Sequence, residues 1–321
     1  MSRLVKVIAI GAALLSSSWA PADQTAIPHI GALLSIGNSP LLSEGLRDGL
    51  RELGYKEGQN VVIEWRSAAS DVELRANAID LALSKLDVIV VNTTAGARAA
   101  LEANTTVPIV FGSGDPVATG LAANLARPGG NATGVSVLST ELYPKRLEYL
   151  HWLAPRARRI AFLMNSSNPI AVTQLEATQK AAPMLGVQLV KLDARNESDL
   201  RTVLHALQRG AADGAIVTND VVYRSAASQV AQVLRKARLP AIFPYRQYLE
   251  EGGLMSYGPD PKDVGRKLAV YVDKILKGAK PADLPIEQLS KYELVIDLRV
   301  ARELKLNVPQ DLLLRADEVI Q

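Results

Sequence analysis

The sequence predicts an α/β protein of two lobes, each a mostly parallel sheet covered by helices. After the first residues, short apolar runs alternate with segments of helical period, which is typical of parallel sheets with covering helices. The chain has 321 residues, 48% of them hydrophobic, and exceeds the size of one ordinary core. Turn sequences rich in glycine and proline lie near residues 130, 252 and 281. We therefore expect three crossings between the lobes.

The first 22 residues have the pattern of a secretory signal peptide. Arg3 and Lys6 precede an apolar run from Val7 to Leu15, which is too short to span a bilayer, and small residues follow. Cleavage after Ala22 is favoured over Ala20, because a cut at Ala20 would place proline directly after it. The chain has no cysteine, which excludes disulfides, a thiol nucleophile and a lipid-bearing cysteine. We expect an exported, periplasmic monomer.

The elements are expected in two successive βα series. In the first half the predicted strands are 29–34, 61–65, 88–92, 109–111 and 133–137, with helices at 40–53, 73–85 and 95–103. In the second half the predicted strands are 160–164, 188–191, 215–218, 241–243 and 254–257. Lobe one would comprise residues 23–132 and 254–283. Lobe two would comprise residues 133–253 and 284–321.

Small polar side chains follow most of these strands. In parallel sheets, ligands bind beyond the carboxyl ends of the strands, so these loops should converge on one cleft. Asp115 and Asn168 each stand before a proline, which is the expected opening of a helix. Free N–H groups at such helix starts would hold a ligand carboxylate without a buried arginine. Any single residue of this kind could also be a simple turn or cap residue.

Several function classes lack their motifs. His29, His151 and His205 stand far apart and have no metal-ligand spacing. The chain has no GxSxG motif and no phosphate-binding loop, and Val117 occupies the third glycine position of a GxGxxG pattern. Without the signal peptide the chain has 34 basic and 33 acidic residues, so its charge balance does not favour a nucleic-acid-binding function. We expect no catalytic residues, no metal and no cofactor.

The segment from Glu251 to Glu287 carries the clearest resemblance. A Gly-Gly turn enters a short strand, a Gly-Pro-Asp loop opens an amphipathic helix, and Gly278 with two prolines ends that helix. This segment, together with Ala316–Ile320, resembles the solute-binding components of ABC importers. The group that includes the tryptophan and tyrosine importer binding proteins is the most similar in pattern, and the resemblance runs from about Ile27 to Ile320.

This resemblance implies a type I periplasmic-binding-protein fold that closes on a small solute and is recognised by the membrane subunits of an importer. It implies a small solute, aromatic amino acids included, and the hydroxyl and amide groups at the strand ends favour a solute that bears a carboxylate; an amino acid, an aromatic acid and another solute all remain open. Thr93, Thr94 and Ser113 would hold the carboxylate, Asp115 or Asp220 an ammonium group, and tyrosines a ring. The full set of expected ligand contacts is Ser35, Thr93, Thr94, Ser113, Asp115, Asn165, Asn168, Asn219, Asp220, Tyr245 and Tyr257.

Other functions remain open at this point. A periplasmic receptor subunit for signalling would use the same cleft. A cleft hydrolase would use Asp115 and Asp220 as its paired carboxylates. A sugar-responsive repressor shares the two-lobed fold but would need a DNA-reading headpiece, where this chain has a signal peptide.

Overall fold

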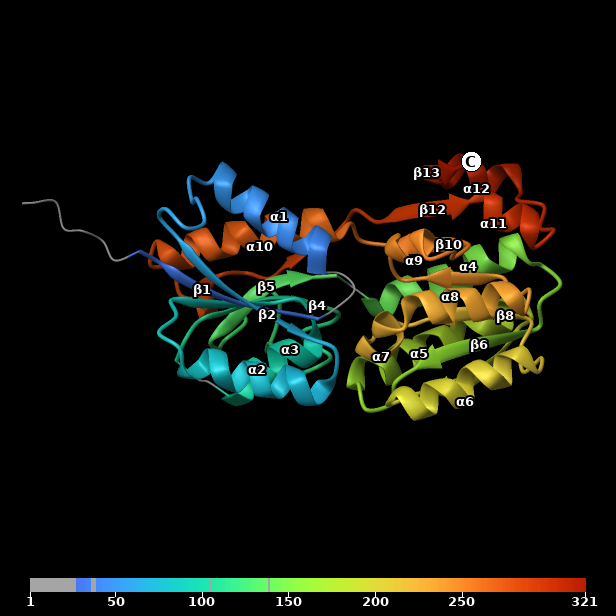
Figure 1. Cartoon of the computed structure of the whole chain (residues 1–321), viewed down its shortest axis with the longest axis horizontal. Coiled ribbons are helices and arrows are strands. Elements are labelled where there is room, and N and C mark those ends of the chain that lie inside the picture. Colours follow the sequence, from blue (N-terminus) through green and yellow to red (C-terminus); the bar gives the residue numbers. More distant parts are fainter. Residues whose placement is uncertain (1–26, 36–38, 104–105, 138) are drawn as a thin grey trace, which may run out of the picture.

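The computed structural model describes residues 27–35, 39–103, 106–137 and 139–321, and the predicted signal peptide lies outside them. The chain forms two α/β lobes that lie side by side (Figure 1). Each lobe is a mostly parallel sheet with helices on both faces, which confirms the predicted fold class.

Lobe one is built on a six-stranded sheet in which all neighbours are parallel, in the order β11-β5-β4-β3-β1-β2. Its strands are β1 (His29–Ser35), β2 (Val62–Ala68), β3 (Val88–Val91), β4 (Ile109–Ser113), β5 (Ala132–Ser136) and β11 (Glu287–Gln288). Its helices are α1 (Ser39–Glu52), α2 (Asp71–Leu83), α3 (Thr94–Ala103) and α10 (Pro261–Leu276), followed by the short η2 (Pro281–Asp283).

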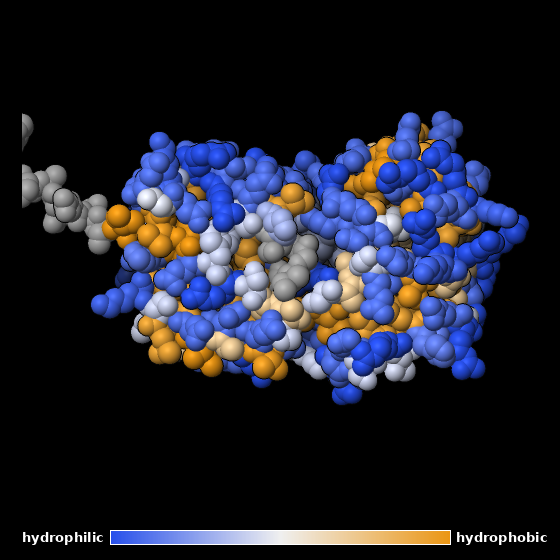
Figure 2. Space-filling view, in the orientation of Figure 1, coloured by the Kyte–Doolittle hydropathy of each residue, from blue (hydrophilic) through white to orange (hydrophobic). Residues whose placement is uncertain are grey.

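Lobe one has two hydrophobic cores, because successive side chains along its strands point to opposite faces of the sheet. Ile30, Ala32 and Leu34 of β1 pack under α1 and α10, whereas Leu33 faces α2 and α3. Helices α1 and α10 approach closely because glycines face each other: a Cβ on Gly45 would lie 2.1 Å from the Lys262 carbonyl oxygen. On the opposite side, hydrophobic residues gather along the lower edge of the lobe, where α2 lies (Figure 2).

Lobe two is built on a seven-stranded sheet in the order β13-β12-β10-β9-β8-β6-β7, in which β10 and β12 pair antiparallel and the other neighbours are parallel. Its strands are β6 (Arg159–Met164), β7 (Gln188–Asp193), β8 (Gly214–Val217), β9 (Ala241–Phe243), β10 (Met255–Gly258), β12 (Glu293–Asp297) and β13 (Glu318–Ile320). Its helices are α4 (Ser139–Leu153), α5 (Pro169–Ala181), η1 (Ala182–Leu185), α6 (Glu197–Gln208), α7 (Val221–Ser225), α8 (Ala227–Lys236), α9 (Gln247–Glu250), α11 (Leu298–Glu303) and α12 (Gln310–Arg315).

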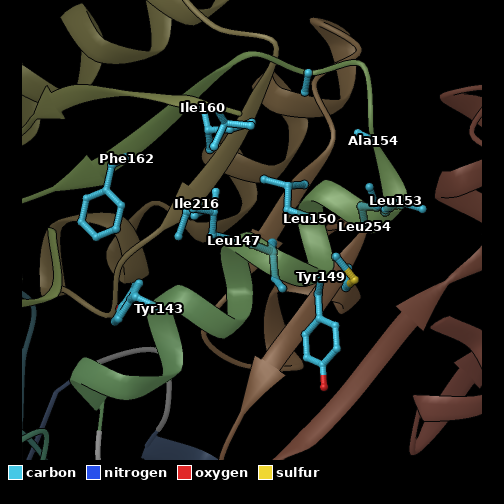
Figure 3. Close-up of a cluster of buried hydrophobic side chains, with 14 of the residues drawn as sticks. Tyr143, Leu147, Tyr149, Leu150, Leu153, Ala154, Ile160, Phe162, Ile216 and Leu254 are labelled. Atoms are coloured by element: carbon cyan, nitrogen blue, oxygen red, sulfur yellow. The ribbon is translucent and has the colours of Figure 1, made fainter. Parts of the chain in front are cut away.

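Helix α4 anchors one face of this second sheet. Tyr143, Leu147 and Leu150 of α4 are fully buried and pack with Phe162 and Ile216 of the strands (Figure 3). Residues 143, 147 and 150 recur at helical spacing, so one stripe of the helix covers the sheet. Helices α6, α7 and α8 contribute to the other core of the lobe, with Leu204, Tyr223 and Val230 among its buried residues. The Tyr143 hydroxyl accepts from the N–H of Asn219, just after β8, so this part of α4 lies at the strand ends that face lobe one.

The chain passes between the sheets three times, and each passage lies a few residues later than the sequence analysis expected. Strand β5 pairs with β4 in lobe one, and β10 pairs with β9 and β12 in lobe two. Strand β11 pairs with β5, so residues 287–288 also belong to lobe one. The passages therefore follow Ser136, Gly258 and Gln288. The sequence analysis placed crossings at Gly-rich turns, which precede the amino ends of β5 and β10. The chain instead crosses at the carboxyl ends of these strands, where the lobes face each other.

Candidate ligand-binding cleft

A cavity lies between the two lobes at the carboxyl ends of their strands. From lobe one its lining includes the segments that follow β2, β3 and β4, and from lobe two the segments that follow β6, β8 and β9. The polar residues that line it are Ser70, Asp71, Asn92, Thr93, Thr94, Ser113, Tyr143, Arg146, Asn168, Gln174, Asn219, Asp220, Arg224 and Tyr245. Both lobes are needed to form this cavity, because neither lobe alone supplies its whole wall.

Most of the predicted contact residues reach this cavity. Those that line it are Thr93, Thr94, Ser113, Asn168, Asn219, Asp220 and Tyr245. Ser35 is the last residue of β1, but its side chain lies outside the described part of the structure. The remaining three predicted residues, Asp115, Asn165 and Tyr257, are not in the lining.

These three residues have structural partners instead. The Asp115 carboxylate accepts a hydrogen bond from the Ala118 N–H at 3.0 Å and caps a series of turns, so no helix begins there as predicted. Asn165 is 1% exposed and donates to the Asp220 carboxylate at 3.1 Å, so it supports the site from beneath. The Tyr257 ring packs edge-on against Tyr149 at a centroid distance of 5.0 Å.

Lobe one contributes hydroxyl groups at the ends of β3 and β4. The Thr93 hydroxyl caps the first turn of α3 by accepting from the Gly96 N–H at 3.0 Å. The Thr94 hydroxyl accepts from the Gly114 N–H at 3.3 Å and joins the two strand ends. Ser113 is 2% exposed, and its hydroxyl has no hydrogen-bond partner in the described part of the chain. A buried hydroxyl of this kind is available to a ligand.

Two arginines that sequence reasoning missed also line the cavity. Arg146 on α4 is 2% exposed; its Nε donates to the Tyr257 carbonyl at 2.8 Å, and its Nη1 has no partner among the described residues. Arg224 on α7 is 5% exposed, and its Nε and Nη1 are likewise without partners there. Burying a guanidinium without an anion is costly. The sequence analysis expected a site that could hold a ligand carboxylate without a buried arginine, whereas two buried arginines line this cavity.

A signal for Arg146 was present in the sequence. It stands three residues after Tyr143 and four before Leu150, both of which are fully buried on α4. An arginine within such an apolar stripe is unusual, since arginine is rarely buried without a partner. The Arg146 guanidinium carbon lies 4.3 Å from the centroid of the Tyr143 ring, and this ring supports it from one side.

Two carboxylates come from opposite lobes. Asp71 is the first residue of α2, and burial together with the nearby charge of Asp220 raises its pKa, whereas the charge of Arg75 opposes the rise. Asp220 caps α7 and is 5% exposed. Its carboxylate accepts hydrogen bonds from the side-chain amides of Asn165 and Asn168 and from the Val222 N–H, each at 3.1 Å. All three of these donors are neutral.

Tyrosines and apolar side chains complete the wall. Asn219 joins two tyrosines, because its N–H donates to the Tyr143 hydroxyl at 3.0 Å and its side-chain amide to the Tyr245 hydroxyl at 2.8 Å. The apolar lining residues include Leu42, Leu74, Leu142, Ile170, Val221 and Val264. The cleft thus combines charged groups of both signs with a wall that suits a hydrophobic body.

Among the described residues, no group of three or more His, Cys, Asp or Glu side chains has the arrangement of a metal site. The described helices also include none that is both long and apolar enough to cross a membrane.

Comparisons with known proteins show which proteins this chain is similar to. The family model of ABC transporter substrate-binding proteins matches residues 33–320. A tyrosine-binding protein of Clostridioides difficile (strain R20291) is 28% identical over 257 residues, which are 79% of this chain and 73% of that protein.

Two solved structures have the same fold over most of the chain. An ABC domain from Streptococcus pneumonia in complex with L-Trp superposes with a TM-score of 0.84 at 27% identity, covering 91% of this chain and 99% of that one. A conserved domain protein from Vibrio cholerae gives a TM-score of 0.84 at 28% identity, with the same two coverages.

Proposed function

The chain belongs to the family of ABC transporter substrate-binding proteins, and we propose that it captures a small carboxylate-bearing solute in the cleft between its lobes for uptake. The solute would have an aromatic or otherwise flat apolar body. The relatives support this class of ligand, because one is named as a tyrosine-binding protein and another was solved with L-Trp.

One observation carries the proposal: buried polar groups without partners line the same cavity. Ser113, Arg146 and Arg224 are each at least 95% buried, and each has a polar atom that no described residue satisfies. Buried polar groups are normally hydrogen-bonded, so such a set indicates where a ligand supplies the missing partners. Two guanidinium groups match a carboxylate in both charge and geometry.

The proposed cellular role is that of a periplasmic monomer that delivers its solute to the membrane subunits of an importer. The family match supports this role, and the predicted signal peptide gives a route of export. Closing of the lobes around the solute would create the surface that the membrane subunits recognise.

A hydrolytic function has less support. Asp115 caps a turn outside the cavity, so the proposed carboxylate pair of a cleft hydrolase is not brought together there. Asp220 accepts three hydrogen bonds from neutral donors, which fixes it in its capping position. A receptor role in signalling would use the same ligand and cleft, and it differs only in the partner.

Thermal-shift screening of the mature chain tests the proposed ligand class. The panel would contain aromatic amino acids, aromatic acids without an amino group, aliphatic amino acids and neutral sugars. A ligand at about 100 times its Kd stabilises the folded protein by about 2.7 kcal/mol, which is a readily measured shift. We expect carboxylate-bearing aromatic solutes to raise the melting temperature and sugars to leave it unchanged. Stabilisation by sugars alone would contradict the proposal.

A further inference from the structure

Helix α2 carries a row of exposed apolar side chains on the side that faces away from its own lobe. Val72 is 80% exposed, Ile79 53% and Leu83 81%, and the exposed Ala76 lies between them. These residues are spaced by four, three and four positions, so they form one row along about three turns of the helix. The core of lobe one does not use this row, because other residues of α2 are buried against it.

Such a row is unusual for the outer side of a helix. The exposed side of α6 shows the ordinary pattern, with Glu197, Arg201 and His205 at helical spacing. Single exposed aliphatic residues are common, but a contiguous apolar surface is typical of a contact with another protein. Hydrophobic surface along α2 is visible at the lower edge of lobe one (Figure 2). The row therefore has the character of an interface that awaits a partner.

The charges that flank the row indicate which partner fits it. Arg75 directly precedes Ala76 and Asp80 directly follows Ile79, and both charged side chains are exposed. In a parallel pair of helices, a residue in the position of Arg75 contacts the residue five positions later on the other helix. Arg75 of one copy of α2 would thus meet Asp80 of a second copy, and the two-fold symmetry forms this ion pair twice.

The opposite orientation of the two helices is disfavoured by the same charges. In an antiparallel pair, residues that precede the row lie beside each other, as do residues that follow it. Arg75 would then lie on the same flank as Arg75 of the second copy, and Asp80 on the same flank as Glu73. Like charges at such positions repel, so the sequence of α2 matches a second α2 in the parallel orientation only.

We propose that a second copy of this chain covers the apolar row, with α2 of one copy packed in parallel against α2 of the other. Val72, Ala76, Ile79 and Leu83 would each pack on their counterparts along the two-fold axis. A contact of about three helical turns is small, so the dimer is weak and exchanges with the monomer. The contact lies on lobe one alone and involves no ligand, so it is independent of the proposed function.

Sedimentation equilibrium of the mature protein, from about 10 μM to about 1 mM, tests this contact in the range where small interfaces associate. We expect the average mass to rise with concentration from that of one chain towards that of two. Leu83→Gln should remove the rise because it interrupts the apolar row, and Arg75→Glu should remove it because the new carboxylate would face Asp80 of the second copy. Exchanging the two charges, with Arg75→Asp and Asp80→Arg in one variant, should restore the rise. Met184→Gln is the matched control, since Met184 is 88% exposed but lies in lobe two.

Three results would overturn the proposal. The mass of a single chain at every concentration would mean that a different protein, or none, covers the row. A dimer that survives both Leu83→Gln and Arg75→Glu would place the contact elsewhere on the molecule. Failure of the charge exchange to restore association would contradict the parallel orientation. Circular dichroism of all variants should match the parent, because the altered side chains are exposed, so loss of folding cannot be mistaken for loss of the contact.

Discussion

At the scale of single residues, the cleft contains buried charge that the folded chain alone does not satisfy. Arg146 and Arg224 are almost completely buried, yet three of their nitrogens have no partner in the described part of the chain. Groups of this kind reduce the stability of the empty protein and are retained where a ligand needs them. Because these arginines lack partners in the folded chain, their substitution should change ligand affinity and stability in a measurable way.

We predict that Arg224→Gln weakens binding of the ligand found by screening and does not destabilise the empty protein. Loss of a charge-assisted hydrogen bond should cost about 1.5–3 kcal/mol of binding free energy. The melting temperature of the empty variant should be unchanged or higher, because an unpaired buried charge is removed. Calorimetry and a thermal melt give the two readouts.

Arg209→Gln serves as the control, since Arg209 is exposed at the end of α6. A variant at Arg224 that melts well below the parent and keeps its affinity would indicate a purely structural arginine.

Sequence reasoning found most of the strand-end residues of the site, Asp220 among them, and missed its arginines, for a definite reason. Ser113 ends a parallel strand, and Thr94 and Asn219 follow one within three residues, so the topology alone places them at the cleft. Arg146 lies within a helix, so the topology of the strand ends gives no indication of it. Its position in the apolar stripe of α4 was the one signal available.

At the scale of elements, helix α2 shows how a small error in the predicted start of a helix leaves a cavity-lining residue unrecognised. The sequence analysis placed its start at residue 73, whereas the helix begins at Asp71. Ser70 and Glu73 have the spacing of a capping box: the Ser70 hydroxyl accepts from the Glu73 N–H at 3.2 Å, and the Glu73 carboxylate accepts from the Ala69 N–H, one residue before the cap, at 2.8 Å. A reading based on this motif would have placed Asp71 at the first helical turn, facing the cleft.

The short strands β11 and β13 could not be predicted from the sequence pattern, for a different reason. Strand β11 has only two residues, and β13 has three. Such short strands carry no measurable alternation, and pairing with β5 and β12 is what defines them.

We predict that Gly45→Ala destabilises the protein, because α1 and α10 meet at this position. The added Cβ would lie 2.1 Å from the Lys262 carbonyl oxygen, which is backbone and cannot rotate away. Overpacking of this kind costs about 1–3 kcal/mol of unfolding free energy. Urea denaturation measures it, and Gly130→Ala is the control, because its added Cβ meets nothing within 4 Å. Equal midpoints for the two variants would mean that the helices separate without cost.

At the scale of the whole molecule, the three passages between the lobes are tied together by aromatic side chains. The Tyr292 hydroxyl, in the third passage, donates to the Leu289 carbonyl at 2.8 Å and lies 3.3 Å from the Val137 carbonyl in the first. Its ring centroid lies 6.0 Å from that of Tyr257, which precedes the second passage. Burial raises the pKa of Tyr292 to about 12, so this hydroxyl stays protonated near neutral pH.

Movement at these passages would open and close the cleft without disturbing either sheet. Each lobe keeps its own cores, and the segments that join the elements at the passages have only two to four residues. In the proposed function, such a hinge would let the ligand bridge the arginines of lobe two and the hydroxyl groups of lobe one.

The central claim is that a solute is captured between two lobes that close on it, and small-angle X-ray scattering tests this most directly. The radius of gyration of the mature protein would be measured with no ligand and with a saturating amount of the ligand found by screening. We expect a smaller radius in the bound state, because the ligand favours the closed arrangement. An unchanged radius at a saturation verified by calorimetry would contradict capture by closure.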